Sequence, residues 1–126
     1  MTLGEYLADA GRKKHVYGAH DCVTFPSDWA LVHGWPDPMA EWRGGYFDDS
    51  PARNGLLEIF SDGFDSAGIP RATDVIEGDV GVISMLGHEA GAIFTGQRWA
   101  VVMPRGLAFV SSHPGMVLRA WRVCRG

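Results

Sequence analysis

The sequence predicts an α+β fold in which N-terminal helices pack on a small antiparallel sheet formed by the C-terminal part of the chain. Apolar residues recur at spacings of three and four over residues 1–70, which is typical of amphipathic helices. Over residues 78–126, short runs rich in Val and Ile alternate with glycines, which is typical of short strands joined by turns. The length of 126 residues suits one core, so we expect residues 1–126 to form a single domain.

The first helix is predicted to begin after Thr2. Thr2 and Glu5 have the spacing of a capping box, in which each side chain accepts a hydrogen bond from the backbone amide of the other. The apolar residues Leu3, Tyr6 and Leu7 then share one face. We expect the basic residues 12–14 to lie in the last helical turn, exposed to solvent, where cations complement the helix dipole.

A second helix is predicted over residues 21–34. Asp21 is a favourable N-cap, and Gly34 is a favourable C-terminal stop. Pro26 lies inside this segment and lacks the amide proton of one helical hydrogen bond. The helix is therefore expected either to begin later than Asp21 or to kink at Pro26.

A third helix is predicted over residues 50–67, because Ser50-Pro51 is a favourable helix start and apolar residues follow at helical spacing. After residue 77 the chain changes to short apolar runs separated by glycines. We expect these runs to be the strands of a small antiparallel, barrel-like sheet. The predicted strands cover residues 80–83, 92–95, 99–103, 107–110 and 117–123.

Composition and charge exclude several classes of function. The net charge is −4, so the chain lacks the basic surplus of a nucleic-acid-binding protein. No apolar run is long enough to span a membrane, and residues 1–15 lack the pattern of a secretory signal, so we expect synthesis in the cytoplasm. Two cysteines are too few for a disulfide scaffold or a four-thiolate zinc site, and a cytoplasmic origin disfavours a Cys22–Cys124 disulfide.

Cys22 is the strongest candidate for a catalytic residue. It is predicted to lie in the first turn of the second helix, where the helix dipole lowers the pKa of a thiol. The neighbouring carboxylate of Asp21 acts in the opposite direction. The alternative is that Cys22 is a small buried apolar side chain.

A nucleophilic thiol needs a base within hydrogen-bond distance and a polar group that orients the base. His88 begins a predicted strand, and a strand can hold an imidazole beside a helix start. His20 is two residues from Cys22, a spacing at which side chains point apart. The other histidines, His15, His33 and His113, are expected at helix ends or in an exposed turn. Together His15, His20, Cys22 and His33 match no standard zinc spacing, so we predict neither a metal nor a cofactor.

Three segments resemble the NlpC-type cysteine peptidases, which are papain-like enzymes that cut bacterial cell-wall peptides. Tyr17-Gly18-Ala19-His20-Asp21-Cys22, followed by Phe25, is similar to the start of their catalytic helix. Gly78-Asp79-Val80 and the segment from His88 to Gly96 resemble two of their strands in the same order. The resemblance implies a papain-like fold with Cys22 as the nucleophile.

A closer resemblance is to small proteins encoded in the tail gene clusters of siphophages, prophages and gene-transfer-agent-like particles. The shared motifs begin with residues 17–22. Asp37-Pro38-Met39-Ala40 and Arg43-Gly44-Gly45-Tyr46 follow, and Gly106-Leu107-Ala108-Phe109 and Ala120-Trp121-Arg122-Val123 complete the series. This resemblance implies a place in a phage tail, and therefore in the virion.

The chain departs from the peptidase pattern at two positions. Counted back from Gly96, the peptidase histidine falls at Ala90, and His88 is two residues earlier on the same side of a regular strand. The third polar group is expected at residues 100–102, where every residue is apolar. The sequence therefore predicts an incomplete active site.

Two functions remain open at this point. In the first, the chain is a tail-tip or baseplate-hub component that binds other tail proteins through exposed aromatic residues, since aromatic residues are enriched at interface hot spots. The candidate contact residues are Trp35, Trp42, Tyr46 and Phe47.

In the second, the chain is a tail-associated cysteine peptidase that cleaves the stem peptides of peptidoglycan during genome delivery. Cys22 would be the nucleophile, His88 the base, and backbone amides at the helix start would stabilise the oxyanion. No residue is assigned to the third polar group.

Overall fold

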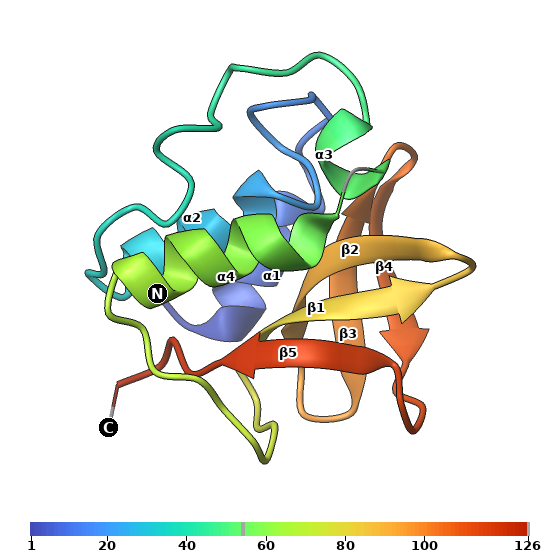
Figure 1. Ribbon diagram of the computed structural model, residues 1–126. Helices are drawn as coiled ribbons and strands as arrows, with labels where there is room; N and C mark the ends of the chain where they lie inside the picture. Colours follow the sequence, from blue (N-terminus) through green and yellow to red (C-terminus); the bar gives the residue numbers. More distant parts are fainter. Residues whose placement is uncertain (54, 126) are drawn as a thin grey trace.

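A computed structural model describes residues 1–53 and 55–125. The helices are α1 (Leu3–Ala10), α2 (Thr24–Val32), α3 (Ser50–Arg53) and α4 (Leu56–Ser66). The strands are β1 (Val80–Met85), β2 (His88–Phe94), β3 (Arg98–Met103), β4 (Gly106–Ser111) and β5 (Val117–Trp121). The predicted α+β class is confirmed, with the helices gathered on one side of the sheet (Figure 1).

Helix α1 begins as predicted and ends earlier than predicted. The Glu5 amide donates to the Thr2 hydroxyl over 3.1 Å, and the Thr2 amide donates to the Glu5 carboxylate over 2.9 Å. The helix stops at Ala10, so residues 12–14 follow it instead of forming its last turn. These residues are exposed, as expected, because they lie beyond the apolar face that anchors the helix.

Helix α2 begins at Thr24, three residues after the predicted N-cap, so the later start is the outcome at Pro26. Pro26 is the third residue of α2, where a missing amide proton costs no intrahelical hydrogen bond. Asp21 still caps this end, because its carboxylate accepts from the amides of Val23 and Thr24. Gly34, at φ 81°, follows the helix as the predicted stop.

The single helix predicted over residues 50–67 is wrong. The chain forms α3 and α4 instead, and Gly55 precedes α4 in the left-handed conformation at φ 105°. A right-handed helix cannot continue through that conformation. The apolar spacing that predicted the third helix belongs to α4, which buries Leu56, Phe60 and Phe64.

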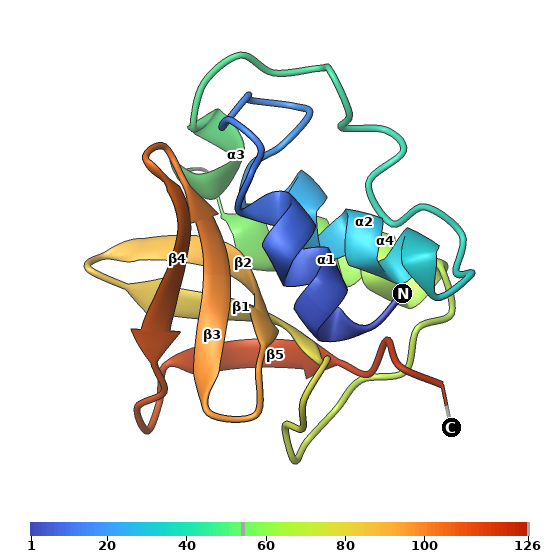
Figure 2. The ribbon, with the colours of Figure 1, turned by 180° about the vertical axis from the view of Figure 1, so that it is seen from behind.

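All five predicted strands are present in one antiparallel sheet of order β4-β3-β2-β1-β5. Strand β2 pairs with β1 over six residue pairs, and with β3 only at Ile93–Ala100 and Phe94–Trp99. The two halves of the sheet can therefore diverge, and Figures 1 and 2 show the resulting strong curvature. Within the described residues no ladder joins β4 to β5, so the sheet is curved but open.

Apolar residues form a core on each face of the sheet. The larger core lies between the helices and the sheet and includes Phe25, Trp29 and Phe60, while the smaller one surrounds Trp99. Gly91 brings the helices close to β2, because a Cβ atom on it would lie 2.2 Å from the carbonyl oxygen of Cys22. In the described part of the chain, no helix is both long and apolar enough to cross a membrane.

Candidate active site around Cys22

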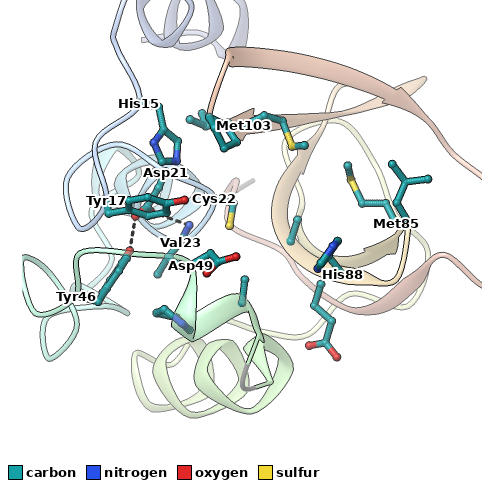
Figure 3. Close-up of a pocket in the computed structure, with 17 residues that line it drawn as sticks. His15, Tyr17, Asp21, Cys22, Val23, Tyr46, Asp49, Met85, His88 and Met103 are labelled. Carbon is teal, nitrogen blue, oxygen red and sulfur yellow. Dashed lines mark hydrogen bonds between the residues drawn. The ribbon is translucent and has the colours of Figure 1, made fainter.

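A pocket of about 200 Å³ lies where the segment before α2 meets the sheet (Figure 3). Cys22, Ala90 and Val102 contribute to its lining, together with side chains from the hairpin between β1 and β2. His15 and His88 also line it, so the pocket brings together the candidate nucleophile and two imidazoles. Most of the remaining lining is apolar and includes Met85, Leu86, Met103 and Pro104.

The turn that carries Cys22 is organised by the buried carboxylate of Asp21. One carboxylate oxygen accepts from the amides of Val23 and Thr24, both at 2.9 Å, and from the Thr24 hydroxyl at 3.1 Å. The other accepts from the Gly18 amide at 2.7 Å and from the Tyr46 hydroxyl at 2.6 Å. Five hydrogen bonds thus satisfy a side chain that is 2% exposed and has no ion pair among the described residues.

Cys22 lies two residues before the first residue of α2 and is half-buried. Burial, followed by the negative charge of Asp21, raises the pKa of the Cys22 thiol to about 11. The backbone amides of Gly91 and of Cys22 itself act in the opposite direction, and the more distant Asp49 adds to the rise. The thiol is therefore protonated at neutral pH, which opposes the activation expected from the helix start.

His88 lines the same pocket, but no hydrogen bond between His88 and Cys22 is found in the described part of the chain. His88 is the first residue of β2, is exposed and pairs with Met85 beside the hairpin turn. Ala90, two residues further along β2, is buried beside Cys22. Two residues span about 6.6 Å of strand, which exceeds the length of a hydrogen bond.

The position that the peptidase resemblance reserves for a histidine is therefore occupied by the methyl group of Ala90. The position of the third polar group is also apolar, because residues 100–102 are buried in β3. Glu89, a carboxylate of the pocket lining, accepts from the Leu57 amide at the start of α4 and so has a structural partner. Among the described residues, no imidazole or carboxylate forms a hydrogen bond with the Cys22 thiol.

The remaining histidines are dispersed. The ring of His15 lies edge-on against Tyr17, with centroids 4.6 Å apart. His20 is 7% exposed and its Nε2 has no hydrogen-bond partner among the described residues. His33 contacts Cys124 instead of Cys22. Throughout residues 1–53 and 55–125, no three metal-ligating side chains are placed to share an ion.

The aromatic residues considered for partner binding differ in exposure. Tyr46 is buried at 6% and bonds Asp21, so its ring belongs to the interior. Trp35 is half-buried, and its Nε1 donates to the Val123 carbonyl over 2.8 Å. Trp42 and Phe47 are exposed at 38% and 87%, and their role in partner binding stays a prediction.

The sequence did not indicate which contacts the motif residues between α2 and α3 form. The guanidinium of Arg43 bonds both carboxylate oxygens of Asp37, at 2.7 and 3.1 Å, and also bonds Asp28 of α2 at 2.7 Å. The Gly44 amide donates to the Gly18 carbonyl over 3.1 Å. The Arg43–Asp28 ion pair connects the long loop to α2, and the Gly44–Gly18 hydrogen bond connects it to the turn before Cys22. The acidic and basic residues of the motif could have suggested the pairing.

Comparisons with known proteins give one result. A family model described as a domain of unknown function, DUF6950, matches residues 1–123. No curated protein and no solved structure matches the chain significantly.

Proposed function

The chain belongs to the DUF6950 family, and we propose that it is a component of a bacteriophage tail tip or baseplate hub, built on a papain-like fold of the NlpC type whose active site is incomplete. In this proposal it is made in the bacterial cytoplasm and carried in the virion. Its partners are other tail proteins.

The observation that carries the proposal is the composition of the Cys22 pocket. The thiol lies before a helix and beside a central strand, which is the arrangement that the resemblance to NlpC-type peptidases implies. The adjacent position on β2 carries Ala90, which cannot act as a base. Among the described residues, no base is hydrogen-bonded to the thiol. Loss of catalytic-group partners costs orders of magnitude in rate, so the pocket favours a scaffold over an enzyme.

Two exposed apolar side chains support a binding role. Leu86, at the tip of the β1–β2 hairpin, is 91% exposed and borders the Cys22 pocket. Phe47 is 87% exposed and directly follows Tyr46, which also lines the pocket. Large side chains that are this exposed contribute apolar area when a partner covers them. We therefore propose that the partner surface includes Phe47 and Leu86.

The first test is assembly. The chain is co-expressed with tail proteins encoded in the same genome, and complexes are isolated by size-exclusion chromatography. We expect a stable complex that Phe47→Asp and Leu86→Asp weaken at least tenfold. Phe109→Asp, which changes a side chain that is 47% exposed on β4, serves as the matched control and keeps the complex. Absence of the protein from purified particles, with normal infectivity of a deletion strain, would contradict the proposal.

The second test separates the scaffold from the peptidase. Digestion of muropeptides by the wild-type protein is compared with that by Cys22→Ser and His88→Ala. The scaffold proposal expects no difference between them, whereas cleavage that both substitutions abolish would establish the peptidase. Ala90→His adds the missing imidazole, and we expect it to accelerate alkylation of Cys22 at pH 7 about tenfold. An unchanged rate would mean that residue 90 does not face the thiol in the way the resemblance implies.

A further inference from the structure

The second cysteine of the chain contacts a histidine. Cys124 follows β5, and its Sγ lies 3.7 Å from Nε2 of His33, the residue that caps the C-terminal end of α2. Both side chains are half-buried, so solvent reaches the pair. Unlike Cys22, Cys124 therefore has an imidazole at hydrogen-bond distance from its sulfur.

Three chain segments hold this pair together. The ring of His33 lies edge-on against Trp29, with centroids 4.4 Å apart. The Gly78 carbonyl accepts from Trp29 Nε1 over 3.0 Å and lies 3.9 Å from the Cys124 sulfur. Gly78 also leaves the room that the sulfur occupies, because a Cβ atom at this position would lie 2.4 Å from Sγ. The contact between Cys124 and His33 is thus fixed by the packing of α2 and of the segment that leads into β1.

Burial is the main influence on the pKa of both groups. Burial, then Asp79 and Glu77, raise the pKa of Cys124, while Arg122 lowers it. Burial lowers the pKa of His33, and the N-terminal amino group and Arg125 act in the same direction. A neutral imidazole with its proton on Nδ1 has a free lone pair on Nε2, and can take the proton of the thiol beside it.

We propose that Cys124 is the reactive thiol of this protein and exchanges with small disulfides, with His33 as its base. The thiol proton passes to Nε2 of His33. The Cys124 sulfur forms a bond to one sulfur of the disulfide as the disulfide bond breaks. The other sulfur leaves as a thiolate and takes the proton back from the imidazolium. The product is a mixed disulfide at Cys124, and no further oxidant is required.

Cys22 provides an internal comparison. Carboxylates raise the pKa of both thiols, but the thiol of Cys22 is more deeply buried, and no histidine bonds it among the described residues. The two cysteines of one chain therefore differ in the features that control thiol reactivity. We expect Cys124 to react first.

The test is the reaction of the folded protein with 4,4′-dithiodipyridine at pH 7, followed by release of the thiopyridone. Cys22→Ser and Cys124→Ser isolate each thiol. We expect Cys124 to react at least about ten times faster than Cys22, in keeping with the dependence of exchange on thiolate formation and access. His33→Gln should slow Cys124 about fivefold or more, because the amide cannot take the proton. His15→Gln, in the Cys22 pocket, is the control and should leave Cys124 unchanged.

Brief labelling of the wild-type protein with peptide mapping gives the order of reaction without any substitution. Faster labelling of Cys22 would overturn the proposal, as would an unchanged Cys124 rate in His33→Gln. Neither outcome bears on the proposed tail function, because that proposal is argued from the Cys22 pocket and not from Cys124.

Discussion

Replacement of Asp21 by alanine tests whether its buried carboxylate organises the Cys22 turn. The change removes the acceptor of five hydrogen bonds, three of them from backbone amides that cannot reorient toward other partners. A buried donor left without a partner costs about 1–3 kcal/mol, and entering water offsets part of that cost, so we expect a loss of about 4 kcal/mol in the free energy of unfolding. At an unfolding entropy of about 0.26 kcal/mol/K for 126 residues, the Tm should fall by about 15 °C.

Two milder substitutions measure how much individual hydrogen bonds of Asp21 contribute to the free energy of unfolding. Asp21→Asn keeps one oxygen for the amides at the start of α2 but turns an NH₂ group toward the Gly18 amide, for an expected loss of about 2 kcal/mol. Tyr46→Phe removes one of the five bonds and should cost about 1 kcal/mol. Because the two residues touch, the double variant should lose less than the sum of the single losses.

The assay is thermal and urea unfolding followed by circular dichroism. Asp9→Ala is the matched control, since the Asp9 side chain is 49% exposed and pairs with Arg12 and Lys13 at 3.8 Å. It should change stability by less than about 0.5 kcal/mol. If Asp21→Ala unfolded within about 4 °C of the wild type, equivalent to about 1 kcal/mol, the hydrogen bonds of Asp21 could not be what holds the turn.

Three further substitutions have defined outcomes. Gly91→Ala places a Cβ 2.2 Å from the Cys22 carbonyl oxygen and should cost about 3 kcal/mol in urea unfolding; full stability would refute the close packing of β2. The pKa of His20 is lowered, mainly by burial, so the stability it contributes is present above about pH 6.5 and is lost as the pH falls below that value. His20→Leu should flatten this decline in Tm between pH 6.5 and 5, and exposed His113→Gln should not. Arg43→Lys keeps the charge but cannot bridge both carboxylates, so a loss of about 1–2 kcal/mol is expected, and an unchanged urea midpoint would contradict the bridging role.

The α+β class and the five strands could be predicted because each strand is a short apolar run bounded by turn residues. The break between α3 and α4 was missed, because the helical spacing that begins at Leu56 does not show where the helix starts, and Gly55 adopts a left-handed conformation just before it. The end of α1 at Ala10 was missed for a related reason: a basic run suits both a last helical turn and the exposed chain after it.

The candidate site was predicted in part. Cys22 was predicted in the first turn of the second helix and instead lies two residues before α2, while the order of motifs correctly placed it near β2, since one pocket contains both Cys22 and Ala90. The high pKa of the thiol was not predicted, because burial depends on which segments cover it. Nor could spacing along the chain indicate that Cys124 would meet His33, since 91 residues separate the two in sequence.

The hydrogen bonds that hold the loop between α2 and α3 also affect how this part of the molecule unfolds locally. Arg43, Gly44 and Tyr46 each bond a different part of the turn and helix around Cys22. Neither segment can leave its place without breaking the bonds of the other, so the two constitute one cooperative unit of local unfolding. The amides of Gly18, Val23 and Gly44 should therefore exchange with solvent deuterium through a single shared opening event. A partner that immobilises Phe47, one residue from Tyr46, would slow the exchange of all three together.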